Sequence, residues 1–125
     1  MNAVLVVDDE DLVRKALVRV LAAGGFACET ASSMHEAAVA FDHYSPDVVL
    51  LNASLGDGSG LDLHRRIRAT DRRRPAVVFV TARRDLFSQM AAQLGPADDW
   101  VGKPWDSAEL VARVRLAASR ACAAM

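Results

Sequence analysis

Polar side chains of chemically useful types follow four of the apolar runs in the sequence. They comprise a pair of carboxylates, an amide, a hydroxyl beside a small side chain, and an ammonium group: Asp8, Asp9, Asn52, Thr81, Ala82 and Lys103. Adjacent carboxylates suit a hard divalent cation such as Mg²⁺, which takes oxygen ligands and shares them with phosphate oxygens. A lysine offers a compact positive charge to a phosphate oxygen, and a threonine hydroxyl can donate to another. The set predicts a pocket for a phosphoryl group beside magnesium, where the small alanine leaves room for an incoming group.

Each member of this set also has an ordinary structural explanation. The two aspartates could stand at a helix N-terminus, where negative charge complements the helix dipole. A threonine at a strand end is common, and a lysine is usually solvated. Lys103 is nevertheless unusual, because only Lys15 and Lys103 among the 15 basic residues are lysine. The joint pattern is therefore much more specific than any one of its members.

Five apolar runs are predicted to be the strands that position these side chains: Ala3–Val7, Phe26–Thr30, Val48–Leu51, Val77–Val80 and Trp100–Val101. The first, third and fourth runs are almost purely aliphatic and do not alternate with polar residues. That pattern is typical of strands buried on both faces, which occur in parallel sheets covered by helices. The second and fifth runs are weaker, so we expect them nearer an edge of the sheet.

Segments of helical periodicity separate the predicted strands: Asp11–Ala23, Met34–His43, Leu61–Ala69, Asp85–Leu94 and Asp106–Ala118. Ser33 and Glu36 form a capping box before the second segment, and Asp106 and Glu109 give a similar signal for the last. Five strand–helix repeats predict an α/β fold, a doubly wound five-stranded parallel sheet in one domain spanning residues 1–125. Because ligands bind at the carboxyl ends of such strands, we expect the polar side chains to converge on one edge.

The composition narrows the classes of function. The chain of 125 residues has a net charge of −1 and a pI near 6.3, which predicts no direct contact with nucleic acid. No apolar run approaches the roughly 20 residues of a membrane span, and no signal peptide is predicted. Cys28 and Cys122 form no CxxC motif and suggest reduced thiols, so we expect a cytoplasmic protein without membrane contact. The three histidines show no metal-ligand spacing.

Five motifs together resemble the receiver domain of two-component response regulators, the CheY-like family: Val6–Glu10, Pro46–Asn52, Gly58–Gly60, Val80–Arg83 and Ala97–Trp105. The resemblance covers the whole chain and implies the flavodoxin-like (βα)5 fold. In that family a histidine kinase donates a phosphoryl group to an aspartate at the end of the third strand. The resemblance therefore implies a signalling switch in a phosphorelay, not an enzyme, with a histidine kinase as partner.

The resemblance places a magnesium site at the first and third strand ends. Asp8 and Asp9 resemble the acidic pair that holds the ion, and the main-chain carbonyl of Ser54 resembles a further ligand. The phosphoacceptor position is Asn52, whose side-chain carbonyl oxygen can also face a cation. A neutral carboxamide attracts a cation less than a carboxylate does, so we expect Mg²⁺ binding to be weakened.

The resemblance assigns phosphate binding and switching to the fourth and fifth strand ends. Lys103 resembles the phosphate-binding lysine and Thr81 the switch hydroxyl, while Ala82 belongs to the phosphate pocket. Trp100 resembles the switch aromatic, although tryptophan is bulkier than the usual tyrosine or phenylalanine. Gly56 stands where the family usually has proline, which predicts a looser loop.

Asn52 is the departure that matters most. A carboxylate can attack phosphorus and form an acyl phosphate, whereas a carboxamide is neutral and a poor nucleophile, so we expect no phosphorylation at residue 52. Two explanations remain open: a natural pseudo-receiver acting as a phosphorylation-independent interaction module, or an Asp-to-Asn variant engineered from an ordinary receiver. The intact remainder of the pocket slightly favours the second. A small phosphohydrolase or flavodoxin-like enzyme on the same sheet lacks an obvious nucleophile.

The last predicted helix resembles the OmpR/PhoB branch of transcription factors through its run Glu109–Arg115. In that branch the fourth helix, fifth strand and fifth helix form a symmetric dimer face held by salt bridges. Asp98, Asp99, Glu109 and Arg113 are the candidates for such a homodimer here, and ordinary surface ion pairs are the alternative. The branch also implies a DNA-binding output domain outside this chain.

Overall fold

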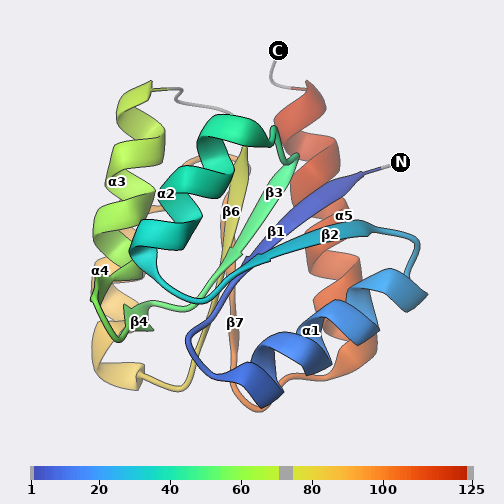
Figure 1. Cartoon of the computed structure of the whole chain (residues 1–125), viewed down its shortest axis with the longest axis horizontal. Helices are drawn as coiled ribbons and strands as arrows, with labels where there is room; N and C mark the ends of the chain where they lie inside the picture. The colour runs from blue at the N-terminus through green and yellow to red at the C-terminus, as the bar shows by residue number, and fades with distance from the viewer. Residues whose placement is uncertain (1, 71–74, 124–125) are drawn as a thin grey trace.

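A five-stranded parallel sheet runs through the centre of the molecule, with helices on both faces (Figure 1). The computed structural model describes residues 2–70 and 75–123, with side chains to residue 121, so the Cys122 side chain lies outside the described part. The strand order is β2-β1-β3-β6-β7, with these bounds: β1 (Ala3–Val7), β2 (Ala27–Ala31), β3 (Val48–Leu51), β6 (Ala76–Thr81) and β7 (Asp99–Gly102). The predicted doubly wound α/β fold is confirmed.

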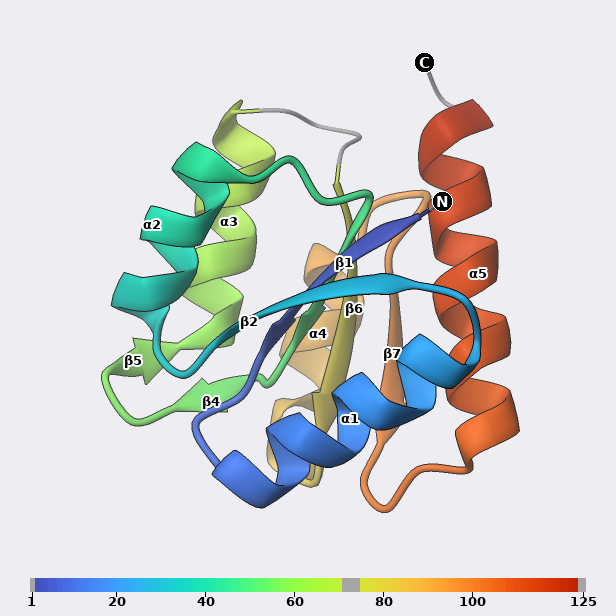
Figure 2. The ribbon, with the colours of Figure 1, turned by 45° about the vertical axis from the view of Figure 1, so that its right-hand side comes forward.

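Two groups of helices cover the two faces of the sheet (Figure 2). One group packs on each side of the strands: α1 (Asp11–Ala23) and α5 (Ser107–Ala123) on the first face, and α2 (Met34–His43), α3 (Gly60–Thr70) and α4 (Phe87–Gln93) on the second. Within the described residues, no helix combines the length and the apolar character that a membrane crossing requires.

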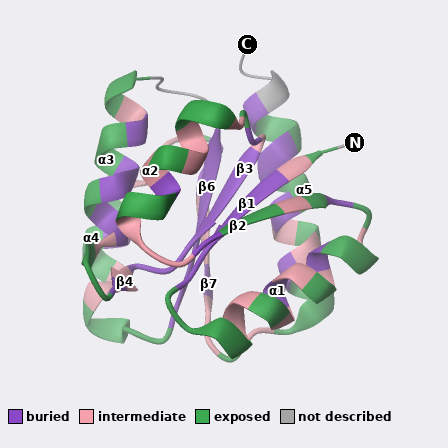
Figure 3. Ribbon diagram, viewed as in Figure 1, coloured by how far each residue is buried: buried purple, intermediate pink, exposed green. Residues whose placement is uncertain are grey.

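The three central strands are buried on both faces (Figure 3). Successive side chains of a strand point to opposite faces. Val4 and Val6 of β1 therefore pack in the core beneath α1 and α5, whereas Leu5 and Val7 pack beneath α2, α3 and α4. Each fully buried aliphatic side chain contributes roughly 1.5–3 kcal/mol, which explains why these runs are continuously aliphatic.

β2 and β7 are the two edge strands, as their weaker apolar runs predicted. β2 begins at Ala27, one residue later than predicted, yet Phe26 is buried and packs in the core. β7 spans Asp99–Gly102 and is longer than the predicted pair Trp100–Val101. An edge strand has one neighbour and exposes more of its side chains, so its apolar signal in the sequence is short.

The capping signals in the sequence correspond to hydrogen bonds in the structure. Ser33 Oγ accepts the main-chain N–H of Glu36 at 3.0 Å, and α2 has the predicted bounds. Asp106 Oδ1 accepts the main-chain N–H of Glu109 at 3.0 Å at the start of α5. That helix continues to Ala123, beyond its predicted end.

The predicted helix Asp85–Leu94 is wrong in its first part. Residues Arg84–Leu86 form a 3-10 turn, η1, and α4 covers only Phe87–Gln93. Neither element has a side-chain hydrogen bond at its N-cap, so the sequence carried no start signal. A short antiparallel pair, β4 (Ser54–Leu55) with β5 (Gly58–Ser59), was also not predicted.

Gly60 allows α3 to begin directly against the loop that follows β3. A Cβ at this position would lie 2.1 Å from the carbonyl oxygen of Asn52 and 3.1 Å from the Cα of Ala53. The Gly60 N–H donates to the carbonyl of Ala53 at 2.9 Å. The close approach involves backbone atoms on both sides, so no side-chain rotation could relieve a methyl group here.

We expect Gly60→Ala to lower the free energy of unfolding by roughly 1–3 kcal/mol, because the added methyl must displace the backbone of residues 52 and 53. Gly102→Ala is the matched control, since a Cβ there would meet nothing within 4 Å. Both variants share the entropic benefit of replacing glycine in the unfolded chain. Urea unfolding of the three proteins measures the difference, and equal midpoints for the two variants would contradict the prediction.

Candidate functional site

The carboxyl ends of β1 and β3 bring two of the predicted side chains to one edge of the sheet. Val7 of β1 pairs with Leu51 of β3, and the main-chain N–H of Asn52 donates to the Val7 carbonyl at 3.0 Å. Asp8 and Asn52 are the next residues on these adjacent strands, which lie about 4.8 Å apart in a sheet. Both side chains are nearly buried. The structure therefore places the amide at 52 beside the first aspartate.

Lys103, which follows β7, contacts Asp8, which follows β1. Its main-chain N–H donates to the Thr81 carbonyl at 3.0 Å, and its Nζ lies 3.0 Å from Asp8 Oδ2. The other oxygen of Asp8 accepts the main-chain N–H of Glu10 at 2.9 Å. A buried carboxylate needs such partners because an unpaired charge away from water is costly. The lysine that stood out in an arginine-rich sequence thus contacts the predicted acidic pair.

Asn52 lies within a loop that comes close to Asp9. The main-chain N–H of Ser54 lies 3.4 Å from Asn52 Oδ1, which accepts it. Asp9 is exposed, and its Oδ2 lies 3.5 Å from the position that a Cβ on Gly56 would occupy. Asn52 and the loop next to Asp9 therefore lie at the same end of the sheet.

Thr81 and Trp100 lie on neighbouring strands but have different surroundings. Thr81 is fully buried, and its Oγ1 accepts the main-chain N–H of Arg83 at 3.0 Å. Ala82 is exposed beside it, so the small side chain leaves the surface open. The Trp100 ring packs against Phe87 at the start of α4, with ring centroids 4.4 Å apart. Trp100 therefore contacts α4, whereas Thr81 stands at the strand-end edge.

Asp57 is a structural residue that the sequence did not single out. Its carboxylate accepts the first two main-chain N–H groups of α2, from Met34 at 2.9 Å and from His35 at 3.1 Å. The hydrogen bond from Met34 is the main cause that holds the pKa of Asp57 below its usual value. Asp57 thereby fixes the β4–β5 turn to α2. It directly follows Gly56, the glycine that was expected to loosen this loop. The partner is 23 residues away, so no local sequence signal could reveal it.

The donor set around the strand edge fits Mg²⁺ only in part. Magnesium is usually bound by one or two carboxylates together with waters and phosphate oxygens. Asp8 and Asp9 supply two carboxylates, and Asn52 supplies a neutral oxygen. Among the described residues, no group of three or more His, Cys, Asp or Glu side chains could hold a metal ion. The residues present are thus compatible with magnesium, but with one negative charge fewer than an aspartate at 52 would give.

Asp98 was expected on a dimer face, and the structure shows that this is wrong for its side chain. Asp98 is 7% exposed and lies against α3 and β6, where it accepts hydrogen bonds from His64, Arg68 and the main-chain N–H of Val77. Burial raises the pKa of Asp98, but these hydrogen bonds outweigh it and hold the pKa well below its usual range. Consecutive acidic residues look alike in a sequence, and only the fold decides which one turns inward.

The other three dimer-face candidates pair with one another within the chain. Arg113 Nη1 lies 2.9 Å from Asp99 Oδ2, and Arg113 Nε lies 2.9 Å from Glu109 Oε1. All three side chains are at least partly exposed. This arrangement is that of ordinary surface ion pairs within one chain, the alternative to a dimer face, and each such pair is worth about 0–1 kcal/mol.

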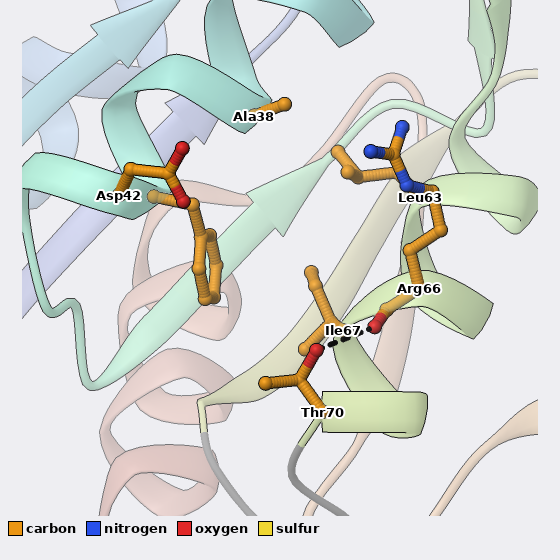
Figure 4. A pocket seen from close by; sticks show the side chains of 7 residues that line it. Ala38, Asp42, Leu63, Arg66, Ile67 and Thr70 are labelled. Atoms are coloured by element: carbon orange, nitrogen blue, oxygen red, sulfur yellow. Dashed lines mark hydrogen bonds between the residues drawn. The ribbon is translucent and has the colours of Figure 1, made fainter.

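A separate hollow of about 190 Å³ lies between α2 and α3, away from the strand-end edge (Figure 4). Residues of both helices line it: Ala38, Phe41, Asp42, Leu63, Arg66, Ile67 and Thr70. The Thr70 hydroxyl donates to the carbonyl of Arg66 at 3.2 Å and so satisfies its own hydrogen bond within the helix. None of the sequence-predicted site residues lines this hollow.

The fold and the strand-end residues define the class of protein. The family model of the response regulator receiver domain matches residues 4–115. The chain therefore belongs to this family and is a receiver domain of a two-component response regulator, the class of signalling module that the sequence motifs indicated.

The relatives are bacterial regulators that are longer than this chain. Transcriptional regulatory protein TrcR of Mycobacterium tuberculosis is 38% identical over 112 residues, which cover 90% of this chain and 43% of that protein. Transcriptional regulatory protein KdpE of the same species is 37% identical over 124 residues, covering 99% of this chain and 54% of that protein. The chain spans about half the length of these curated relatives.

Solved structures support the same assignment. A receiver domain protein from Clostridium thermocellum superposes with a TM-score of 0.88 at 26% identity, over all of both chains. The response regulator TrrA of Thermotoga maritima superposes with a TM-score of 0.84 at 27% identity, covering 94% of this chain and 99% of that one. The TrrA structure is a complex with Mg²⁺ and BeF.

We expect Asn52→Asp to lower the unfolding temperature of the chain in the presence of a chelator. The variant adds a third carboxylate beside Asp8 and Asp9, and the resulting repulsion should cost on the order of 1–2 kcal/mol. Millimolar Mg²⁺ should narrow the gap, because the cation binds the aspartate form more tightly and stabilises it by mass action.

Asn2→Asp is the matched control, because it makes the same chemical change at an exposed position before β1. Its unfolding temperature should change little in chelator and should not respond to Mg²⁺ differently from that of the parent chain. Equal unfolding midpoints for the parent and Asn52→Asp in chelator would show that the three side chains do not interact.

Proposed function

We propose that this receiver domain signals without accepting a phosphoryl group at residue 52. The observation that supports this most directly is a carboxamide at the strand-end position beside Asp8, whose carboxylate contacts Lys103. In the family this position carries the acceptor carboxylate. A carboxamide lacks the negative charge that makes a carboxylate oxygen nucleophilic enough to attack phosphorus. The nearby Lys103 ammonium could attract a phosphate-bearing donor, but no acyl phosphate would form.

The remaining pocket residues keep the roles that the family resemblance implies. Asp8, Asp9, the Asn52 side-chain oxygen and the Ser54 main-chain carbonyl would hold Mg²⁺, which would neutralise charge on a bound phosphoryl group. The contact between Lys103 and Asp8 supports this assignment, since a cation-binding carboxylate and a phosphate-binding ammonium must lie within reach of one another.

The switching residues complete the proposed pocket. Thr81 would offer its hydroxyl to phosphate, and Ala82 would leave room for it. Trp100 would report the state of the pocket through its contact with Phe87 on α4. A path of this kind explains how a change at the strand ends could alter an outer surface.

Two origins of Asn52 fit this proposal. In the first, the chain is a natural pseudo-receiver that acts as an interaction module independently of phosphorylation. In the second, it is an Asp-to-Asn variant of an ordinary receiver. The presence of every other pocket residue supports the second, because a chain released from phosphorylation has no need of Thr81 or Lys103.

The wider setting follows from the named relatives. Residues 1–125 form a single receiver domain that would sit beside a DNA-binding output domain of the OmpR/PhoB kind, because the relatives are transcriptional regulatory proteins of about twice the length. A histidine kinase would be its partner in the cytoplasm. Asp99, Glu109 and Arg113 would support a homodimer by exchanging their ion pairs between two copies of the chain.

The acceptor chemistry can be tested by mass spectrometry after incubation with Mg²⁺ and a small phosphodonor. We expect no added phosphoryl group on residue 52 of the present chain and stoichiometric addition to the Asn52→Asp variant. Asn52→Ala is the matched control, because it also lacks the carboxylate and should stay unmodified.

Each result bears on a different part of the proposal. An acyl phosphate on residue 52 of the parent chain would refute it. A folded Asn52→Asp variant that fails to react with the phosphodonor would show that the rest of the pocket has lost its function. That outcome would favour the natural pseudo-receiver over the Asp-to-Asn variant.

A further inference from the structure

A buried histidine joins three segments on the side of the sheet covered by α2, α3 and α4. His64 of α3 is 2% exposed, and both of its ring nitrogens have partners. Nε2 lies 2.8 Å from Asp98 Oδ2, and Nδ1 lies 3.2 Å from the side-chain nitrogen of Gln93, the last residue of α4. The ring edge also packs against Phe79 of β6. We call His64, Gln93 and Asp98 the His64 cluster.

The partners of His64 determine where its proton lies. Asp98 is a carboxylate that can only accept hydrogen bonds, so Nε2 must carry the proton. Arg68 and the main-chain N–H groups of Val77 and Gly95 also donate to Asp98, which keeps it ionised.

The orientation of the Gln93 amide follows from a second contact. Its side-chain nitrogen lies 3.2 Å from the main-chain carbonyl of Leu61, which can only accept. That atom must therefore be the NH₂ group and not the oxygen. An NH₂ group can only donate here, so Nδ1 of His64 must accept. The cluster thus requires a neutral His64 with its proton on Nε2.

We propose that the His64 cluster is a proton-sensitive anchor, which holds the end of α4 to α3 through two hydrogen bonds of Gln93 while His64 is neutral and through only one when the ring takes up a second proton. If Nδ1 were protonated, its N–H would face the NH₂ group of Gln93. Two donors would then meet with no acceptor between them. Rotation of the amide would not repair it, because Gln93 Oε1 would then face the Leu61 carbonyl. Either way Gln93 loses a hydrogen bond to α3.

The charges around His64 make a doubly protonated ring unstable within the closed cluster. Asp98 from the loop before β7 and Arg68 from α3 are the charged groups that face the ring, and they already neutralise each other. The described contacts from β6 and α4 come from uncharged groups, Phe79 and Gln93. A second ring proton would therefore leave an excess positive charge in the core, which is costly.

Besides these hydrogen bonds, hydrophobic packing of Met90 and Leu94 holds the end of α4. The helix has seven residues and no side-chain hydrogen bond at its N-cap, and Met90 is its buried residue. Gln93 Oε1 is buried without a hydrogen-bond partner in the described part of the chain, so the amide has no alternative contact to compensate for the loss. Loss of this contact would loosen the end of α4, whereas the hydrogen bonds of Asp98 would still hold the segment before β7. The mechanism involves no residue of the phosphate pocket and does not depend on the chemistry at residue 52.

The anchor can be tested by NMR on the uniformly ¹⁵N-labelled chain. At neutral pH the ring nitrogens of His64 should report the Nε2–H tautomer. As the pH is lowered through the titration of His64, amide protons at the end of α4 should lose about tenfold in protection from exchange, after correction for the intrinsic exchange rate. A tenfold change matches the loss of about one hydrogen bond to a buried group.

Two variants distinguish loss of the His64–Gln93 contact from a general loss of stability at low pH. His64→Gln keeps a donor for Asp98 and an acceptor for Gln93 but does not titrate, so α4 protection should become independent of pH. Gln93→Leu keeps the histidine but removes the contact, so titration of His64 should no longer change α4 protection, and this variant serves if His64→Gln does not fold. His35→Gln and His43→Gln are controls at exposed positions of α2 and should keep the parent behaviour.

Three results would overturn the proposal. One is an Nδ1–H tautomer at neutral pH. Another is a His64 ring that stays neutral down to the pH at which the protein unfolds. The third is α4 protection that stays constant while His64 titrates, or that falls equally in the parent chain and in the variants lacking the contact.

Discussion

Burial of the central strands on both faces is the constraint on which the rest of the structure depends. Every residue of β3 and β6 is buried, so polar side chains are excluded from the middle of the sheet and can appear only where a strand ends. Parallel strands bring those ends to one edge, which is why residues as far apart in sequence as Asp8 and Lys103 come within 3.0 Å. The polar cluster at the strand ends is thus a consequence of how the sheet is covered.

The same constraint explains what could be predicted from the sequence. The three aliphatic runs predicted the central strands, because burial on both faces leaves a continuous apolar signal. The polar residues after these runs predicted which end of the sheet carries polar side chains. α4 was placed poorly, since a short helix without a cap has almost no signal of its own. The role of Asp98 could not be predicted, because its partners lie on α3 and β6 and neighbouring aspartates differ only in the direction they face. The contact of Asp57 with α2 is equally nonlocal.

Buried polar groups divide the molecule into two regions with different tasks. At the strand-end edge, Asp8 and Lys103 form a partly solvated pair that an incoming ion or phosphate group could rearrange. On the face under α3 and α4, Asp98 accepts hydrogen bonds from four residues and fixes the approach to β7. Trp100 of β7 contacts Phe87 at the start of α4, with ring centroids 4.4 Å apart.

The tight contact at Gly60 has a consequence for how such a domain can change over generations. The three atoms nearest to a Cβ on this glycine are backbone atoms of residues 52 and 53, so the close contact itself does not involve the side chain of residue 52. Codons for aspartate and asparagine differ by a single base. A lineage can therefore lose or regain the acceptor in one mutational step, and that step replaces none of the backbone atoms that meet Gly60.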